Sequence, residues 1–569
     1  METRGSKSND KKKQNSRDKT MNQKIAQGIL SIYFVVMTVI YPYYAPGGYL
    51  RIGEEKYVFF RNVTMAVVAV MLIFILCTLL QRPGLLTGYY HQMSVTDWFA
   101  YGYFVSVMLS YLCSPYKEEA FWGADGWHMG VVMQMLFVIL YFLFSRYFEF
   151  HIRWLAVWLV AAAGVFLLGI LNRYSVYPIV LEGQTPVFIS TLGNINWFCG
   201  YWSVTAPMGM TLYWIAKKKR YRVFAGIYSF VAILAGIVQG SDSAYLVFAT
   251  VYAALFLFSI HSWQRFHRWM ELCILFAAAC QTGRLLRSLP GMQMNYGSAL
   301  NGGIPSLMER LTNGNGTLWV LCVFLLVYVI IRLKFQKGDL EEDCRTQIPL
   351  WNRLGRTGKI ICAMIVIVLV CICLCGIGRA RGLLCEGRDG TVSGMKGSQE
   401  TRLRDSRDGT RVMLFQEDWG NGRGAAWNCS IEAYQELDTL HRIVGVGPDC
   451  FAAYIYEVPL LAKRLIEEFG QERLTNAHNE GLSLLINVGV LGFLCYYGFV
   501  GSVLIWFGKR ADRCPFLYVC AVSLLAYTVH NMVSFQQVLS TPFFFILLGI
   551  GRRSSVDDEI LQSEIMGVV

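Results

Sequence analysis

Charged residues are scarce in this chain: they make up 16% of its 569 residues, against about 25% in typical soluble proteins. Hydrophobic residues reach 54%, and the mean hydropathy is +0.40. So little charge excludes an ordinary soluble domain and indicates a protein integral to a membrane. No small-residue cleavage site follows the first apolar run, so we predict an uncleaved first span rather than a signal peptide.

Motifs that would indicate other kinds of function are also missing. The sequence has no internal repeat, no Walker or dinucleotide-binding fingerprint, and no CxxC or Cys/His spacing typical of zinc sites. Most of the seventeen cysteines fall within apolar runs, where thiols behave as small apolar residues. Cys385, Cys429 and Cys450 fall in a long polar segment, where one disulfide could form. We therefore expect no metal ion and no other cofactor.

The sequence contains many long apolar runs. About fourteen segments approach the ~20 residues that an α-helix needs to cross a bilayer. They lie near residues 25–43, 59–80, 95–113, 128–147, 152–171, 197–216, 221–239, 243–260, 267–285, 317–334, 358–378, 480–507, 514–532 and 535–551. This pattern predicts an all-α fold, a polytopic membrane bundle of about 12–14 helices with one large, partly helical loop.

The chain divides into five parts on this pattern. We predict a basic disordered tail (1–24), a bundle of about eleven spans (25–378), a polar loop (379–479), the last spans (480–551) and a short tail (552–569). The short basic connections all fall on the side of the N-terminal tail. Because Lys and Arg mark cytoplasmic loops, both tails are predicted to be cytoplasmic, and the large loop is predicted to face outward. The basic residues behind the net charge of +12 are then expected to lie on the cytoplasmic face and to interact with anionic lipid. Nucleic acid is not expected as a partner.

The large loop has an internal pattern of its own. Residues 386–411 are polar and Gly-rich, which is typical of flexible segments. The apolar spacing in AAWNCSIEAYQELDTLHRI (425–443) predicts an amphipathic helix. The sequence GVGPD (445–449) predicts a turn, and the apolar spacing over 452–469 predicts a second helix. We expect these two helices to cap an outward-facing cavity.

Two residues of this loop carry the chemistry that the sequence suggests. Arg423 comes one residue before the first predicted helix, where a guanidinium can bind phosphate oxygens, although an exposed arginine is also common there. His478 lies directly before an apolar helix, where it can serve as a general base or have only a structural role. Glu480, two residues further on, could orient the His478 ring, although close neighbours on a helix do not face each other. His128 and His530 are expected to pack or to support the site.

Four segments resemble a known family when they are taken in order. They are LGNINWFCGYWSVTAPMGM (192–210), GRGAAWNCSIEAY with HRIVGVGPDCF, TNAHNEGLSLLINVGVLG (475–492) and VHNMVSFQQVLSTPFFFILLGI (529–550). With the long outer loop, they make the chain similar to the O-antigen ligases and polysaccharide polymerases, which are bacterial membrane glycosyltransferases of cell-envelope polysaccharide biosynthesis.

The resemblance implies a reaction and a set of residues. The donor would be a glycan on undecaprenyl pyrophosphate, and the acceptor a hydroxyl of a glycan, lipid, wall polymer or protein, with inversion at the anomeric carbon. Arg423 would bind the pyrophosphate, and His478 would deprotonate the acceptor. Asn194, Asn196, Trp427 and Asn479 would contact substrate. The family's Ser-x-Ser-Arg-like turn reads GSDSAY (240–245) here, so a second guanidinium would come from Arg284, Arg287 or Arg310, with Arg173 as a further outer-face candidate.

Two other readings stay open beside this enzyme. A flippase or transporter of lipid-linked oligosaccharide would need related halves and ionisable residues deep within the spans, and the sequence has little of either. A passive membrane scaffold would leave Arg423 and His478 without a role. Within the enzyme reading, the sequence does not separate a polymerase from a ligase.

Overall fold

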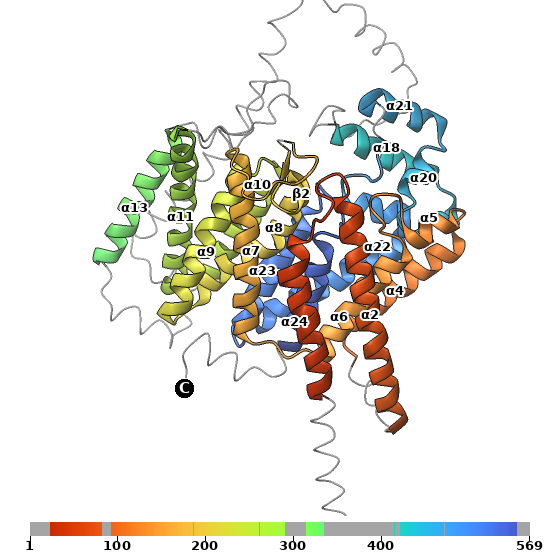
Figure 1. Cartoon of the computed structure of the whole chain (residues 1–569), viewed down its shortest axis with the longest axis horizontal. Helices are drawn as coiled ribbons and strands as arrows, with labels where there is room; N and C mark the ends of the chain where they lie inside the picture. The colour runs from red at the N-terminus through yellow and green to blue at the C-terminus, as the bar shows by residue number, and fades with distance from the viewer. Residues whose placement is uncertain are drawn as a thin grey trace, which may run out of the picture.

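The computed structural model describes residues 23–81, 93–185, 187–260, 262–290, 315–334, 415, 422–470 and 473–554. Within these ranges the protein is almost entirely helical (Figure 1). The strands found there are β1 (Phe188–Ile189) and β2 (Gly193–Asn194), two residues each, which pair antiparallel with Phe188 opposite Asn194. The predicted all-α class is therefore confirmed.

Helices overlap every predicted apolar segment except 358–378, which lies outside the described residues together with 386–411 and most of both predicted tails. These helices are the first helix (Gln23–Tyr43, ending in the π-helix η1 Val36–Ile40 and the 3-10 helix η2 Tyr41–Tyr43), α2 (Ile52–Gln81), α4 (Val95–Cys113), α6 (Val131–Tyr147), α7 (Ile152–Arg173), α8 (Ile195–Ile215), α9 (Lys219–Val238), α10 (Ser243–Ser259), α11 (Trp263–Ser288), α13 (Gly316–Lys334), α22 (Glu480–Arg510), α23 (Phe516–His530) and α24 (Thr541–Ser554).

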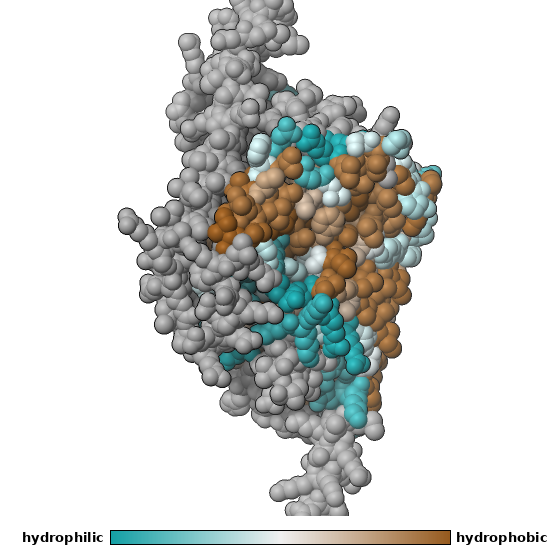
Figure 2. Space-filling model, turned by 90° about the vertical axis from the view of Figure 1, so that its left-hand side faces the viewer, coloured by the Kyte–Doolittle hydropathy of each residue, from teal (hydrophilic) through white to brown (hydrophobic). Residues whose placement is uncertain are grey.

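Five of the described helices are long and apolar enough to cross a membrane. They are the first helix, α2, α7, α9 and α22. Shorter apolar helices, α6, α10, α13 and α23, accompany them. On the face that carries α11 and α13, exposed side chains are strongly hydrophobic, and Figure 2 shows a broad hydrophobic area there with hydrophilic residues below it. The exposed residues on α13 include Leu318, Trp319, Val323, Leu326 and Val329. Such a surface fits lipid better than water.

Two helices begin elsewhere than predicted, each for a polar reason. α2 begins at Ile52 rather than near residue 59, and it therefore includes Lys56, which is fully buried. The Nζ of Lys56 donates to the carbonyl oxygens of Tyr41 (2.9 Å) and Pro42 (3.1 Å), where the first helix ends. α24 begins at Thr541 rather than near residue 535, because residues 531–540 form a polar loop.

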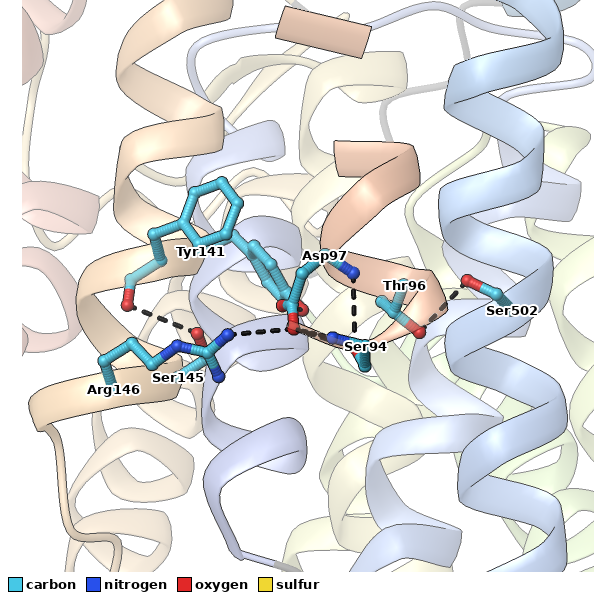
Figure 3. Close-up of polar contacts among 8 residues, drawn as sticks. Ser94, Thr96, Asp97, Tyr141, Ser145, Arg146 and Ser502 are labelled. Atoms are coloured by element: carbon cyan, nitrogen blue, oxygen red, sulfur yellow. Dashed lines mark hydrogen bonds and ion pairs between the residues drawn. The ribbon is translucent and has the colours of Figure 1, made fainter. Parts of the chain in front are cut away.

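A cluster of polar side chains around the buried Asp97 connects three helices at the beginning of α4 (Figure 3). Asp97 is fully buried and accepts hydrogen bonds from Tyr141 Oη (2.7 Å) and from Arg146 Nη2 (2.8 Å), both on α6. On the other side of α4, Ser502 Oγ of α22 donates to Thr96 Oγ1 at 3.1 Å. Because a buried carboxylate is stable only when it is paired and hydrogen-bonded, this cluster fixes the mutual positions of α4, α6 and α22.

Residues 422–470 form short helices that gather at one end of the bundle, near α5 (Lys117–Trp122) (Figure 1). They are α18 (Arg423–Glu436), α19 (Thr439–Val444), α20 (Phe451–Ile455) and α21 (Pro459–Phe469). The second predicted helix is thus two helices, because the chain turns at 456–458 and Pro459 starts a new one. Cys429 and Cys450 are both buried free thiols, so they do not form a disulfide with each other.

Candidate functional site

His478 lies in the turn from which α22 starts. Asn479 is the N-cap residue, and its Oδ1 accepts a hydrogen bond from Leu482 N at 3.1 Å. His478 itself has a φ of 47°, a left-handed conformation uncommon for residues other than glycine, and its N–H donates to Asn476 Oδ1 at 3.0 Å. The ring of His478 meets Phe535 edge to face, with ring centres 5.3 Å apart. The turn therefore fixes the imidazole before the helix begins.

Arg423 lies close enough to His478 for its charge to act on the imidazole, although 54 residues separate them in the chain. It is the first residue of α18 rather than the residue before a helix, because Gly422 is the N-cap with a φ of 82°. A Cβ on Gly422 would lie 2.8 Å from the Phe469 ring, so this sharp entry requires glycine. Burial and then the positive charge of Arg423 lower the pKa of His478 to about 4. The two predicted catalytic residues are thus brought together, and the imidazole is neutral at neutral pH.

The turn between α9 and α10 lies on the same side as Arg423. Burial lowers the pKa of Arg423, and the carboxylate of Asp242 opposes that effect. Asp242 is exposed, and its neighbour Ser241 donates from Oγ to Asn196 Oδ1 at 2.7 Å. Asn194 is the N-cap of α8, and its Oδ1 accepts from Asn196 N at 2.8 Å. Asn196, from the segment 192–210 that resembles the family, therefore contacts the GSDSA turn (240–244), which departs from the family's pattern.

A second arginine lies beside this turn. Arg173 ends α7, is 5% exposed, and donates from Nε to the carbonyl oxygen of Val238 at 2.9 Å. A Cβ on Gly240 would lie 3.0 Å from its Nη2 atom. The sequence offers Arg173 with Arg284, Arg287 and Arg310 as outer-face candidates, and the first three lie at span ends, where an arginine often only extends its charge toward water. Its burial against the 240–243 turn is a feature of the fold alone.

The other predicted substrate residues have the following positions. Arg284, near the end of α11, is exposed and donates to Asn315 Oδ1 at 2.9 Å. Arg287 lies on the last turn of the same helix and is partly buried. Arg310 lies outside the described residues. Trp427, one helical turn after Arg423 on α18, is partly buried and packs edge to face on Phe415. The described contacts of Arg284 and Trp427 are therefore with protein groups.

The carboxylate of Glu480 is bound by the loop between α23 and α24, not by the imidazole of His478. Glu480 is 3% exposed, and its carboxylate accepts from Asn531 Nδ2 (2.5 Å) and Gln536 Nε2 (2.8 Å), in the loop between α23 and α24. His530 starts this loop, is 1% exposed, and shares a 3.0 Å hydrogen bond with Asn531 Oδ1. The carboxylate of Glu480 is thus held by this loop and does not orient the ring, because residues two apart at a helix start point in different directions.

The GVGPD turn docks into a break in α22. Gly489 has φ 66° and ψ −174°, which interrupts the helix and frees carbonyl groups one turn earlier. Val446 N donates to Ile486 O (2.9 Å), and Gly447 N donates to Asn487 O (3.0 Å). The predicted turn is therefore confirmed, and its backbone satisfies groups that a buried broken helix would leave unpaired.

Asp449 fastens the end of this turn to the start of α6. Its Oδ2 accepts hydrogen bonds from Ala124 N and Met129 N, both at 2.8 Å. Burial, opposed by these two bonds, raises the pKa of the Asp449 carboxyl to about 7. Asp449 has a φ of 62°, so the backbone here is held in a strained conformation by its contacts.

A cavity lies between this turn, α22 and the loop after α23. Its lining comprises Tyr103, Trp127, Met129, Gln134, Pro448, Asp449, Asn476, Glu480, Ser483, Leu484, Asn487, Val488, Phe535 and Gln536. Asn476 and Phe535, which both contact His478, belong to this lining. Sequence reasoning missed Asn487, for which one signal existed: an amide in the middle of an apolar run shortly before a glycine.

The described part of the chain contains no group of three or more His, Cys, Asp or Glu side chains that could hold a metal ion. No protein-family model matches the chain, and no curated protein is significantly similar to it. The functional assignment therefore depends on the geometry of this site, together with the resemblance in the four segments.

Proposed function

We propose that the protein is a membrane glycosyltransferase of the O-antigen ligase and polymerase type, acting on glycans carried by undecaprenyl pyrophosphate. The observation that carries the proposal is the juxtaposition of His478 and Arg423, close enough for the arginine to lower the pKa of the histidine. A neutral imidazole beside a guanidinium supplies both groups that such a transfer needs, a base for a hydroxyl and a cation for a pyrophosphate.

The arrangement of the helices supports a membrane protein with this site on the outer face. The start of the first helix and the end of α24 share one face, because Glu149 contacts both Gln23 (2.6 Å) and Arg553 (3.8 Å). His478 packs on Phe535, which precedes the start of α24, so His478 and Arg423 lie toward the opposite end of α24 from Arg553. With the basic connections in the cytoplasm, both tails are cytoplasmic, and residues 422–479 form an outer cap over a polytopic bundle.

The reaction follows from the two side chains. The imidazole of His478 accepts the proton of the acceptor hydroxyl as its oxygen attacks the anomeric carbon of the donor. The bond between that carbon and the pyrophosphate oxygen breaks, and undecaprenyl pyrophosphate leaves with the electron pair. Arg423 stabilises the leaving pyrophosphate, and displacement from the opposite face inverts the anomeric centre.

The electrostatics of the pair connect donor binding to catalysis. A histidine with a pKa of about 4 is a weak base, and the charge of Arg423 is one cause of this low value. A bound pyrophosphate neutralises that charge and adds negative charge nearby, so it raises the pKa of His478 toward the working pH. The base therefore gains strength when the donor is in place.

Arg173 is the second cation that we assign to the pyrophosphate. Its place beside Gly240 puts it at the turn that carries Asp242, and Asp242 in turn interacts with Arg423. Two guanidinium groups around one turn fit a pyrophosphate better than one, because each can bind a separate phosphate. Asp242 keeps the pair of cations partly balanced while no donor is bound.

The test compares cells that make the wild-type protein with cells that make His478→Ala or Arg423→Ala. We expect both variants to reach the membrane and to accumulate lipid-linked precursor, with long or transferred glycan reduced by at least about a hundredfold for His478→Ala, the range typical of a lost general base. Precursor and product are measured by gel separation of labelled glycans.

His441→Ala and Arg442→Ala are matched controls, because these residues lie in the same loop and His441 instead binds Asp438 at 2.7 Å. Both controls should make normal glycan. If His478→Ala and Arg423→Ala also make normal product, the transferase assignment is wrong. Precursor trapped on the cytoplasmic face in those variants would instead favour a flippase.

A further inference from the structure

The cavity beside His478 differs in chemistry from the arginine side of the site. It has about 50 Å³ of room, enough for on the order of four water molecules, and it is partly open. Two carboxyl groups, Asp449 and Glu480, belong to its wall, and its described lining includes no Lys or Arg that could hold a phosphate. A pyrophosphate is therefore disfavoured in this cavity, whereas the guanidinium of Arg423 favours it outside.

The polar wall of the cavity includes oxygen acceptors from three side chains. The Oδ1 atom of Asn487 is buried and has no hydrogen-bond partner among the described residues. Glu480 and Asp449 present carboxylate oxygens that are held in place by Asn531, Gln536 and backbone N–H groups. A ligand that fits this wall must donate several hydrogen bonds without carrying negative charge, as the hydroxyl groups of a sugar do.

Aromatic rings line the same cavity and continue toward His478. Trp127 packs edge to face on Phe535 with ring centres 4.7 Å apart, and Phe535 packs in the same way on His478. Trp197, in the first turn of α8, also meets Trp127 at 5.7 Å. Flat apolar surface beside fixed oxygen acceptors matches the two sides of a sugar ring, one bearing C–H groups and the other hydroxyls.

We propose that this cavity is the acceptor subsite, which binds the hydroxyl-bearing edge of a single uncharged sugar residue and presents it to His478. The proposal rests on the transferase function proposed above. Asn476 and Phe535 connect the two sites, since both line the cavity and both contact His478. Donor and acceptor are thus separated by charge, with the pyrophosphate on the arginine side and the acceptor sugar on the carboxylate side.

The test separates donor cleavage from transfer in one reaction. Membrane vesicles containing the full chain receive radiolabelled undecaprenyl pyrophosphate-linked glycan, extracted from producing cells that lack this protein. Released undecaprenyl pyrophosphate and transferred glycan are both measured. For Asn487→Leu we expect the ratio of transfer to release to fall about tenfold, because water replaces a poorly held acceptor, while release itself persists.

Asn487→Asp keeps an oxygen acceptor at the same place and should restore most of the transfer. Gln435→Leu, an equal change at an exposed position of α18, should match the wild type. An unchanged ratio in Asn487→Leu overturns the acceptor subsite and leaves the transferase intact. Parallel loss of release and transfer in both Asn487 variants overturns it too, because Asn487 is then structural. A wild-type protein that yields neither product overturns the transferase function and this proposal together.

Discussion

At His478, burial and a neighbouring positive charge act in the same direction, and both favour the neutral imidazole. At an ordinary site, a histidine pKa near 6.5 would leave part of the base protonated in mildly acidic conditions. Burial and the charge of Arg423 keep His478 unprotonated in such conditions, but they also make its imidazole a weaker base. The residue is thus poised to respond to an anion that arrives beside the arginine.

This electrostatic pairing predicts the pH dependence of the reaction. Activity requires unprotonated His478, so its acid limb lies where His478 gains a proton. For kcat/KM, which reports the free enzyme, we expect this limb well below 6.5, toward pH 4; for kcat, with pyrophosphate bound, we expect it at higher pH. Initial rates of glycan transfer in vesicles between pH 4 and 8 provide the measurement.

Arg423→Gln should move the acid limb of kcat/KM upward, because the repulsion that lowers the pKa of His478 is lost. His441→Ala should leave both limbs unchanged. An acid limb of kcat/KM near 6.5 in the wild type would contradict the lowering of the pKa of His478 by burial and by Arg423.

Single residues show how far the sequence could lead. The types of His478 and Arg423 suggested a base and an anion-binding group, and these suggestions needed no fold. The partners of Glu480 could not be predicted, because Asn531 and Gln536 lie on a loop some fifty residues away and reach it only through packing of α22 against α23. Side-chain direction at a helix start depends on such contacts.

Among the helices, α22 combines two structural tasks in one element. Its first part carries the His478 turn and the cavity wall, and its second part is an uninterrupted apolar helix. The break at Gly489 allows the 445–447 turn to approach so closely that a Cβ on Gly489 would lie 2.2 Å from the carbonyl oxygen of Ile443. A helix without this break would displace the loop that carries Asp449.

Gly489→Ala is therefore expected to destabilise the protein strongly. A positive φ and a backbone clash together should cost roughly 2–4 kcal/mol of unfolding free energy. Gly501→Ala, in the same helix with open space around its Cα, is the matched control and should be neutral or stabilising by up to about 1 kcal/mol. Thermal unfolding of the purified proteins in detergent measures both. Equal unfolding temperatures for the two variants would show that the helix break at Gly489 does not contribute to the stability of the protein.

Helix boundaries were predictable where hydrophobicity and helix ended together. α4 covers Val95–Cys113 as predicted, because Ser94 and Asp97 form a capping box directly before the apolar run. α2 extends further than its apolar run, because Lys56 is helical yet satisfied by carbonyls of another segment. An apolar run in the sequence ends at the first charged residue, whereas a helix ends where its backbone N–H and C=O groups bond to groups outside the helix.

For the whole molecule, the proposed orientation is directly testable. A fluorescent protein fused after residue 569 should fluoresce, because it folds in the cytoplasm, and alkaline phosphatase inserted at residue 398 should be active, because it folds outside. The exchanged fusions, phosphatase at the C-terminus and fluorescent protein at residue 398, should both be inactive at equal expression. Activity in the exchanged pair would place the His478 site in the cytoplasm and exclude a role on the outer face.

The sequence by itself determined the helical class, most of the helices and the chemical types at positions 423 and 478, because these depend on local composition and spacing. Only the tertiary structure decided that Arg423 lies beside His478, that Arg173 lies beside the 240–243 turn, and that Asp449, Glu480 and Asn487 wall one cavity. Those relations arise from packing between segments far apart in the chain. Local hydrophobic pattern carries no information about which polar groups that packing brings together.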